Sequence, residues 1–185
     1  MLDYAINSAL IISNTAILKH DKAGVITFNK EVHVFQKAER KEITMHKILE
    51  TLYNQQTMFL ESDYEYLTIF VKKHLKHRSL LVLYTNFEYI TAVHRRMRYL
   101  RNLASNHLLL VVIYENTAIK QLINQSTENL QKIYHQTIAE KYEHEKKLII
   151  KELNKHGILT VYTPPGELTP NLINKYLELK NRGIF

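Results

Sequence analysis

Cysteine is absent from this 185-residue chain. Disulfide frameworks, thiolate metal sites and cysteine nucleophiles are therefore excluded together, and the composition fits a reducing compartment. Proline and glycine are scarce, at three and four residues, so the sequence has little room for a linker. We therefore predict a single domain over residues 1–185.

Long apolar runs are also missing. The longest, residues 108–114, is far shorter than the roughly 18 residues that cross a bilayer. The first 20 residues are apolar but lack the basic start and cleavage site of a signal peptide, so we interpret them as an amphipathic helix. Because the chain opens in mid-helix, we expect a segment upstream. We expect the protein to be cytoplasmic, or the soluble domain of a membrane-anchored parent.

Motifs that carry catalysis are absent too. The sequence has no glycine-rich phosphate loop, no G-x-S-x-G and no H-E-x-x-H. Ten histidines are scattered, and the pair with helical spacing, His74 and His77, lies among lysines that oppose a bound cation. We therefore assign no catalytic residue and predict that the chain is not an enzyme.

A folded α/β domain is indicated by what is present. The chain is 45% hydrophobic and 23% charged, enough to bury a core. Asn29-Lys30 is predicted to join two short strands in a hairpin, Ser62-x-x-Glu65 to open a helix as a capping box, and Thr169 with Pro170 to cap the last helix. Helical periodicity covers residues 2–20, 43–53, 62–76, 87–104 and 117–155, the last with a break near residues 124–126.

Three later segments read as buried strands. "SLLVLYT", "HLLLVVIYE" and "GILTVYT" are continuously apolar, as strands covered on both faces are. They alternate with helices, which predicts a doubly wound, mostly parallel sheet. In such a sheet the loops that follow the strands meet at the carboxyl edge, where ligands bind.

That edge is predicted to be rich in oxygen and almost free of basic residues. Such a rim suits a hard cation better than a phosphate. Thr85-x-x-Glu88 also fits a capping box for the next helix, and we prefer that interpretation of this turn. The predicted rim residues that would meet a partner are Thr57, Thr85, Asn86, Glu88, Glu115 and Asn116.

The net charge of +7 is concentrated in two clusters, residues 72–78 and 94–101, both expected at the amino edge of the sheet. The second cluster contains Arg95, Arg96, Arg98 and Arg101. We favour a solvated face that complements helix carboxyl ends. Binding of nucleic acid or an anionic membrane, and contact with a protein, are the alternatives.

The segments "DKAGVITFNKEVHVF", "RSLLVLYTNFE", "HLLLVVIYEN" and "HGILTVYTPPGELTPNLINKYLELKNRG" together resemble the carboxyl half of the domain of unknown function 58 family. The resemblance covers essentially the whole chain and is closest to the subgroup of Bacteroidetes-type bacteria. It implies a von Willebrand factor A-like sheet of order 3-2-1-4-5-6 with an antiparallel edge strand. "AGVITF" would be the second strand and "VHVFQ" the third, and the first strand has no counterpart here.

The same resemblance bears on metal binding. Domains of this kind hold a divalent cation with an Asp-x-Ser-x-Ser loop, a threonine and an aspartate. The loop is missing from this chain, the threonine would be Thr57, and the aspartate position falls on Asn86. With its carboxylates lost, the adhesion site is expected to be degenerate. We therefore expect no tightly bound magnesium and no other cofactor, with Thr57 and Asn86 as the weak metal candidates.

The resemblance implies a non-catalytic protein–protein interaction domain that is a partner of a MoxR-type AAA ATPase in the assembly or maturation of other complexes. A basic module that binds anionic membrane or nucleic acid is one alternative, and a hydrolytic or nucleotide-handling enzyme is another. The missing strand predicts either that "AGVITF" pairs directly beside "SLLVLYT" or that exposed sheet edges make a homodimer.

Overall fold

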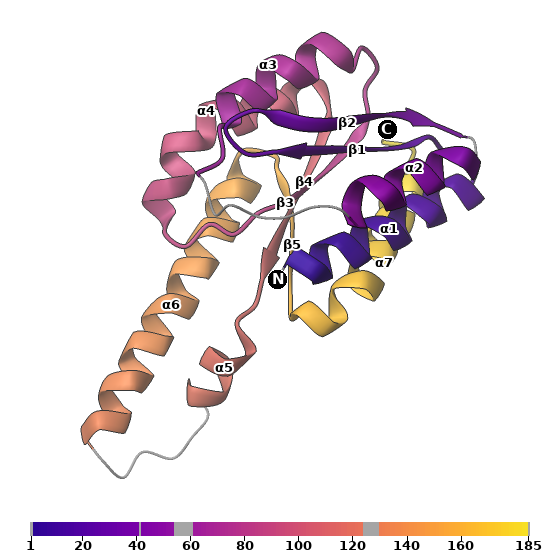
Figure 1. Cartoon of the computed structure of the whole chain (residues 1–185). Coiled ribbons are helices and arrows are strands. Elements are labelled where there is room, and N and C mark those ends of the chain that lie inside the picture. Colours follow the sequence, from indigo (N-terminus) through magenta and orange to yellow (C-terminus); the bar gives the residue numbers. More distant parts are fainter. Residues whose placement is uncertain (1, 41, 54–60, 124–129, 185) are drawn as a thin grey trace. The chain divides into compact units, whose positions relative to one another are not determined.

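The computed structural model describes residues 2–40, 42–53, 61–123 and 130–184 (Figure 1). The chain is divided into two compact units. One comprises Met1–Ser79 and Pro165–Phe185, and the other is Leu80–Pro164. The mixed α/β character that the sequence predicts is confirmed.

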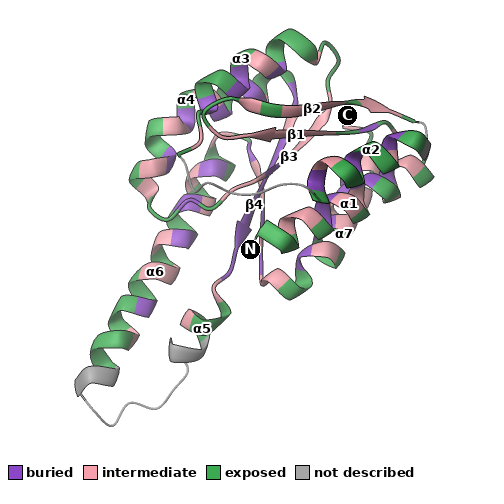
Figure 2. Cartoon of the chain, in the orientation of Figure 1, coloured by how far each residue is buried: buried purple, intermediate pink, exposed green. Residues whose placement is uncertain are grey.

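A three-stranded parallel sheet forms the centre of the unit Leu80–Pro164. Its strands are β3 (Leu80–Tyr84), β4 (Leu108–Tyr114) and β5 (Leu159–Thr163), in the order β3-β4-β5. β4 pairs in register on both sides, with Leu81 opposite Leu109 and Val112 opposite Val161. It is buried along almost its whole length (Figure 2). The predicted parallel strands are therefore present, and the central one is the most apolar because it has a neighbour on each side.

Helices α4 (Ile90–Asn106), α5 (Thr117–Ile123) and α6 (Leu130–Lys155) connect these strands. α4 buries Val93, Met97 and Leu100, as its apolar spacing predicts, and Leu103 completes the buried stripe. The predicted break in the second connection falls at residues that lie outside the described part of the chain. Within that part, no helix has the length and apolar character that a membrane-spanning segment requires.

The other unit combines a hairpin with helices. Its elements are α1 (Leu2–Leu18), β1 (Ala23–Phe28), β2 (Val32–Glu39), α2 (Glu42–Tyr53), α3 (Tyr64–His74), the 3-10 turn η1 (Pro165–Glu167) and α7 (Leu168–Asn181). β1 and β2 are antiparallel and form a two-stranded sheet of their own. The predicted hairpin is thus confirmed, but its turn holds three residues because Phe28 pairs with Val32.

The parallel sheet has an edge at β3. In the order β3-β4-β5, β3 is hydrogen-bonded to β4 on one side. An edge strand presents unpaired amide and carbonyl groups.

Helix α1 packs in an unexpected orientation. It contacts α2 and α7 through small side chains, Ser8, Ala9, Ser13 and Ala16, which are buried. Several of its large residues, among them Leu2 and Leu18, are exposed instead, and Leu18 is 70% accessible. Small side chains let neighbouring helices approach closely, which explains why they face inward.

Two helix starts differ from their predictions. The N-cap of α3 is Asp63, whose carboxylate accepts a 2.9 Å hydrogen bond from the Tyr66 amide, so Ser62 is not the cap. Asp and Ser are equally good caps, so adjacent candidates are hard to rank from sequence. α7 begins at Leu168, which places Pro170 inside the first turn, where a missing N–H costs no helical hydrogen bond.

Candidate functional site

The carboxyl edge of the parallel sheet carries the loops that follow β3, β4 and β5. Because the three strands are parallel, these loops meet at one edge, as the sequence predicts. Of the predicted rim, Thr85, Asn86 and Glu88 follow β3, and Glu115 and Asn116 follow β4. Thr57 lies outside the described residues.

A lysine from α6 lies beneath the loop after β3. Lys146 has no accessible surface. Its ammonium donates a hydrogen bond to the Phe87 carbonyl oxygen and another, of 3.3 Å, to Asn86 Oδ1. The same ammonium lies 4.8 Å from the centre of the Tyr142 ring, a cation–π distance. Asn86, which the sequence suggests as a weak metal ligand, therefore accepts a hydrogen bond from a buried ammonium group.

Burial governs the protonation of this lysine. Desolvation lowers the pKa of Lys146, while the carboxylates of Glu88 and Glu143 oppose the shift. Burial also raises the pKa of Tyr142, with Glu88 and Glu143 adding to the effect. The tyrosine is thereby held in its neutral form, whose ring still attracts a cation.

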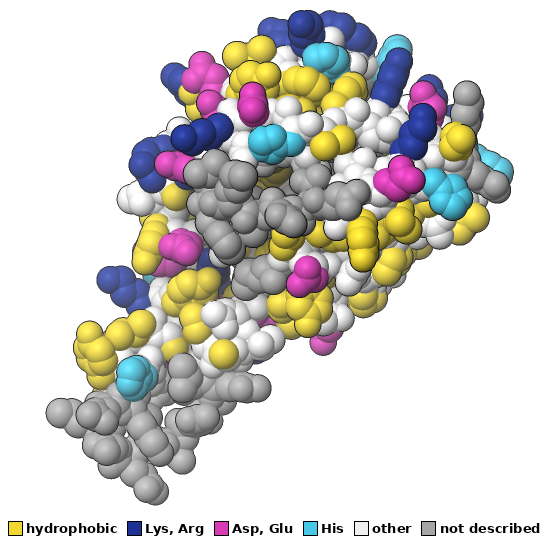
Figure 3. Space-filling model, in the orientation of Figure 1, with side chains coloured by type: hydrophobic (Ala, Val, Ile, Leu, Met, Phe, Trp, Pro, Cys, Tyr) yellow, Lys and Arg dark blue, Asp and Glu magenta, His cyan; other side chains and the backbone are white. Residues whose placement is uncertain are grey.

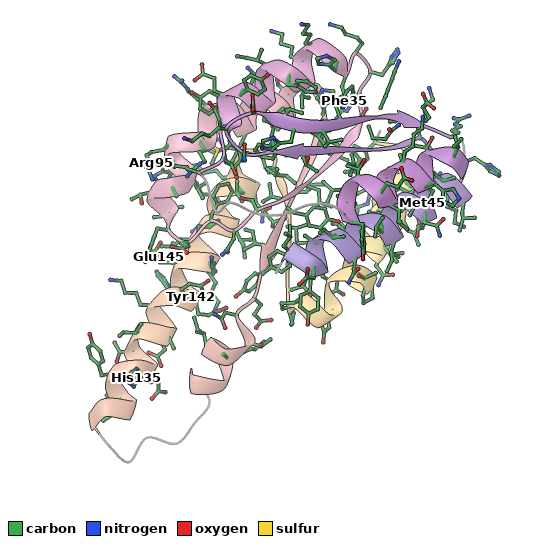
Figure 4. All side chains as sticks on the ribbon, in the orientation of Figure 1. Phe35, Met45, Arg95, His135, Tyr142 and Glu145 are labelled. Carbon is green, nitrogen blue, oxygen red and sulfur yellow. The ribbon has the colours of Figure 1, made fainter. Side chains whose placement is uncertain are left out.

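α6 also supplies the acceptor for the start of α4. The Ile90 amide donates a 3.1 Å hydrogen bond to Glu145 Oε2. Glu145 lies one turn from Tyr142 on the same helix (Figure 4). The N-cap of α4 is Tyr89, whose side chain makes no capping hydrogen bond, so the predicted capping box of Thr85 and Glu88 is wrong. Glu145, which is distant in sequence, accepts the first amide of α4 in place of the predicted capping box.

The acidic side chain after β4 is paired as well. Glu115 is buried and forms a 2.6 Å ion pair with Lys120 of α5. Asn116 Oδ1 accepts hydrogen bonds from the amides of Ala118 and Ile119, at 3.1 and 3.3 Å, and so caps α5. Two lysines therefore reach this edge, Lys120 and Lys146. The prediction of a rim almost free of basic residues is wrong, because lysine side chains from α5 and α6 contact the residues of the rim.

β5 contributes a tyrosine to the same cluster. The Tyr162 hydroxyl donates a 2.8 Å hydrogen bond to Glu143 Oε2. Burial and this carboxylate raise the pKa of Tyr162, so the hydroxyl keeps its proton and remains a donor. The hydrogen bond ties α6 to β5 next to the lysine.

Several of these residues were missed from the sequence. The segment "KYEHEKK" (residues 141–147) mixes positive and negative charges, a pattern that is typical of a solvated helix surface. One signal could have found the lysine: Ala139, Lys146, Ile149 and Leu153 follow helical spacing, and all four are buried. A lysine on an apolar stripe is rarely buried without partners, so its position predicts oxygen acceptors nearby.

Metal binding has little support from this donor set. The weak candidate Asn86 uses its side-chain oxygen to accept from an ammonium. Among the residues that the structure describes, no three His, Asp or Glu side chains gather into a group that could hold a metal ion. The corner is organised around an internal cation.

The four arginines of α4 differ in exposure and surroundings. Arg95 is exposed on the helix (Figure 4), whereas Arg96 is half-buried and donates a 3.2 Å hydrogen bond to the Ala92 carbonyl. Arg98 and Arg101 instead line a pocket at the carboxyl end of α4. Lys and Arg side chains are visible over this helix in Figure 3. Of the predicted basic surface, Arg95, Arg98 and Arg101 are exposed, and whether it binds a partner stays a prediction.

Comparisons of the chain with protein-family models, with curated proteins and with solved structures each give no match.

Proposed function

We propose that this chain is a non-catalytic protein-binding domain of the von Willebrand factor A-like type, and that its partner binds over the corner formed by residues 86–89. A MoxR-type AAA ATPase is the partner that the sequence resemblance implies. The corner follows β3 and leads into α4, at the edge where α/β domains bind their ligands.

The support for this proposal is the way the corner is held. Lys146 binds its backbone and one side chain from beneath, and Glu145 accepts the first amide of the following helix. Asn86, Glu88 and Tyr89 remain exposed above, and Tyr89 is 59% accessible. A loop that is held on its buried side and exposed on the other is preorganised for binding. Tyrosine is also enriched among the residues that contribute most to binding energy.

Electrostatics favours a protein contact over metal-mediated adhesion. A divalent cation bound to Asn86 would lie close to the Lys146 ammonium. At about 4 Å and an effective dielectric constant of about 20, the repulsion is about 8 kcal/mol. A partner that offers hydrogen-bond donors to Asn86 and Glu88 meets no such penalty. The hydrolytic alternative stays a hypothesis to which no residue is assigned.

The test is a binding measurement with a bacterial MoxR-type AAA ATPase. Glu88→Lys and Tyr89→Ala alter the exposed side of the corner and leave the contacts of Lys146 in place. Glu140→Lys, an equal change of charge at an exposed position of α6, is the control. We expect binding to be lost with the first two variants and kept with the third. Equal binding by all three would refute the assignment of the corner.

A further inference from the structure

A pocket opens at the opposite edge of the parallel sheet. Its volume is about 580 Å³, within the range of roughly 300–1,000 Å³ that small-molecule sites occupy. The walls come from the end of α4 and from the turn between α6 and β5. The residues that line it are Arg98, Arg101, Asn102, Ala104, Ser105, His156 and Gly157.

Two guanidinium groups face this space from adjacent turns of α4. Arg98 and Arg101 are three residues apart, which places them on neighbouring positions of one helix face. The Arg98 guanidinium lies 4.4 Å from the centre of the Tyr99 ring and donates to the Tyr99 hydroxyl, which fixes its plane. Arg101 is exposed and forms no ion pair with any residue that the structure describes.

Some helix carbonyls at this edge already have donors. Asn102 O accepts from Ser105 Oγ at 2.8 Å and from Asn106 Nδ2 at 3.2 Å. At the end of α6, the amides of Gly157 and Ile158 bond the carbonyls of residues 154 and 153, at 3.0 and 3.1 Å. The two guanidinium groups that line the pocket attract an anion, although two helix carboxyl ends point at it.

The pocket residue His156 has an acidic partner. Glu152 Oε1 lies 3.2 Å from His156 Nε2 and 3.9 Å from His94 Nε2. Glu152 is therefore paired with imidazole groups. Gly157, in the turn between α6 and β5, adds no side chain to the pocket. Its φ is 72°, and nothing lies within 4 Å of where a Cβ would be.

We propose that this pocket binds a phosphate-class anion, held by the guanidinium groups of Arg98 and Arg101 with His156 at its side. Guanidinium forks match phosphate oxygens in pairs, and Arg is the preferred residue for such recognition. A discrete phosphate group fits better than a nucleic-acid or membrane surface, because Arg95 and Arg96 do not line the pocket. This site is independent of the proposed partner corner.

The experiment titrates the full chain with inorganic phosphate and with pyrophosphate, followed by calorimetry and by amide chemical shifts. We expect saturable binding, with shifts centred on Gly157 and the end of α4. Arg98→Ala and Arg101→Ala should weaken it about tenfold or more, whereas Arg95→Ala, the matched control on the same helix, should leave it unchanged. Circular dichroism checks that each variant is folded.

Several results would overturn the proposal. Binding that fails to saturate, or that is unchanged in Arg101→Ala, would remove the pocket as a site. A similar loss in Arg95→Ala would show diffuse attraction to the helix. Vesicles with anionic lipid and single-stranded DNA are tested in parallel: binding to either that depends on all four arginines alike and disappears near about 150 mM salt would replace the pocket with a general basic surface.

Discussion

Replacement of Lys146 tests the organisation of the corner most directly. Its stem is fully buried, and its ammonium binds the Phe87 carbonyl and Asn86. Lys146→Ala removes three buried methylenes beyond Cβ, worth about 0.8 kcal/mol each, and leaves two acceptors without this donor, worth about 1–3 kcal/mol. The ammonium's desolvation cost is recovered in part. We expect a net loss of about 2–4 kcal/mol in the free energy of unfolding.

Two companion variants separate the parts of that loss. Lys146→Met keeps most of the stem volume but removes the charge and the donor, so it should be about 2 kcal/mol more stable than Lys146→Ala. Lys147→Ala changes the exposed neighbour on the same helix and should shift stability by about 0.5 kcal/mol or less. Urea unfolding followed by circular dichroism gives all four free energies.

The pH dependence supplies a second readout. Burial lowers the pKa of Lys146 in the folded chain below its usual value of about 10.4. Between these two pKa values the unfolded chain binds more protons, so the stability of the wild type should rise with pH relative to Lys146→Met. Below the folded pKa the difference should be constant. The reasoning is refuted if Lys146→Ala matches Lys147→Ala, or if the wild type and Lys146→Met have the same pH profile.

Four further substitutions have defined outcomes. Asp21 forms a 2.6 Å ion pair with Lys180, and although burial opposes ionisation, the hydrogen bonds of Asp21 lower its pKa. Asp21→Asn should therefore lower the free energy of unfolding by about 1 kcal/mol near neutral pH. In thermal melts the stability difference between wild type and variant should disappear as pH falls through that lowered pKa. Gly24→Ala would place a Cβ 2.6 Å from the β2 backbone and should cost about 1–3 kcal/mol in urea unfolding, whereas Gly166→Ala, with open space around it, should be nearly neutral. Glu145→Ala removes the acceptor for the first amide of α4 and should cost about 1 kcal/mol, and an unchanged midpoint would contradict that role.

Most of the secondary structure could be predicted from the pattern of apolar residues. Apolar runs of strand length located β3, β4 and β5, and their alternation with helices predicted the parallel pairing that brings Asn86 and Glu115 to one edge. These features depend on local composition and on a general rule of sheet topology, so they can be read from one sequence. The same holds for the hairpin, whose strands flank Asn29 at short range.

Helix ends and charge partners were harder to predict, because their determinants are distant in sequence. The start of α4 is set by Glu145, 55 residues away, and not by the local Thr85-x-x-Glu88 pattern. The rim's charge balance is set by Lys146, 60 residues from Asn86. A charged residue within a charge-rich helix gives no warning of burial unless it is counted on the apolar stripe.

Helix α6 runs between the two edges of the parallel sheet. Lys146 serves the carboxyl edge, and His156, ten residues later, borders the pocket at the amino edge. At 1.5 Å per residue, the helix separates them by about 15 Å, beyond the range of roughly 7–10 Å within which mutational effects couple. The stability changes of Lys146→Met and His156→Ala should therefore add within about 0.5 kcal/mol in the double variant. A larger deviation in urea unfolding would mean that α6 transmits changes between the edges, and the corner and the pocket would then have to be treated as one coupled site.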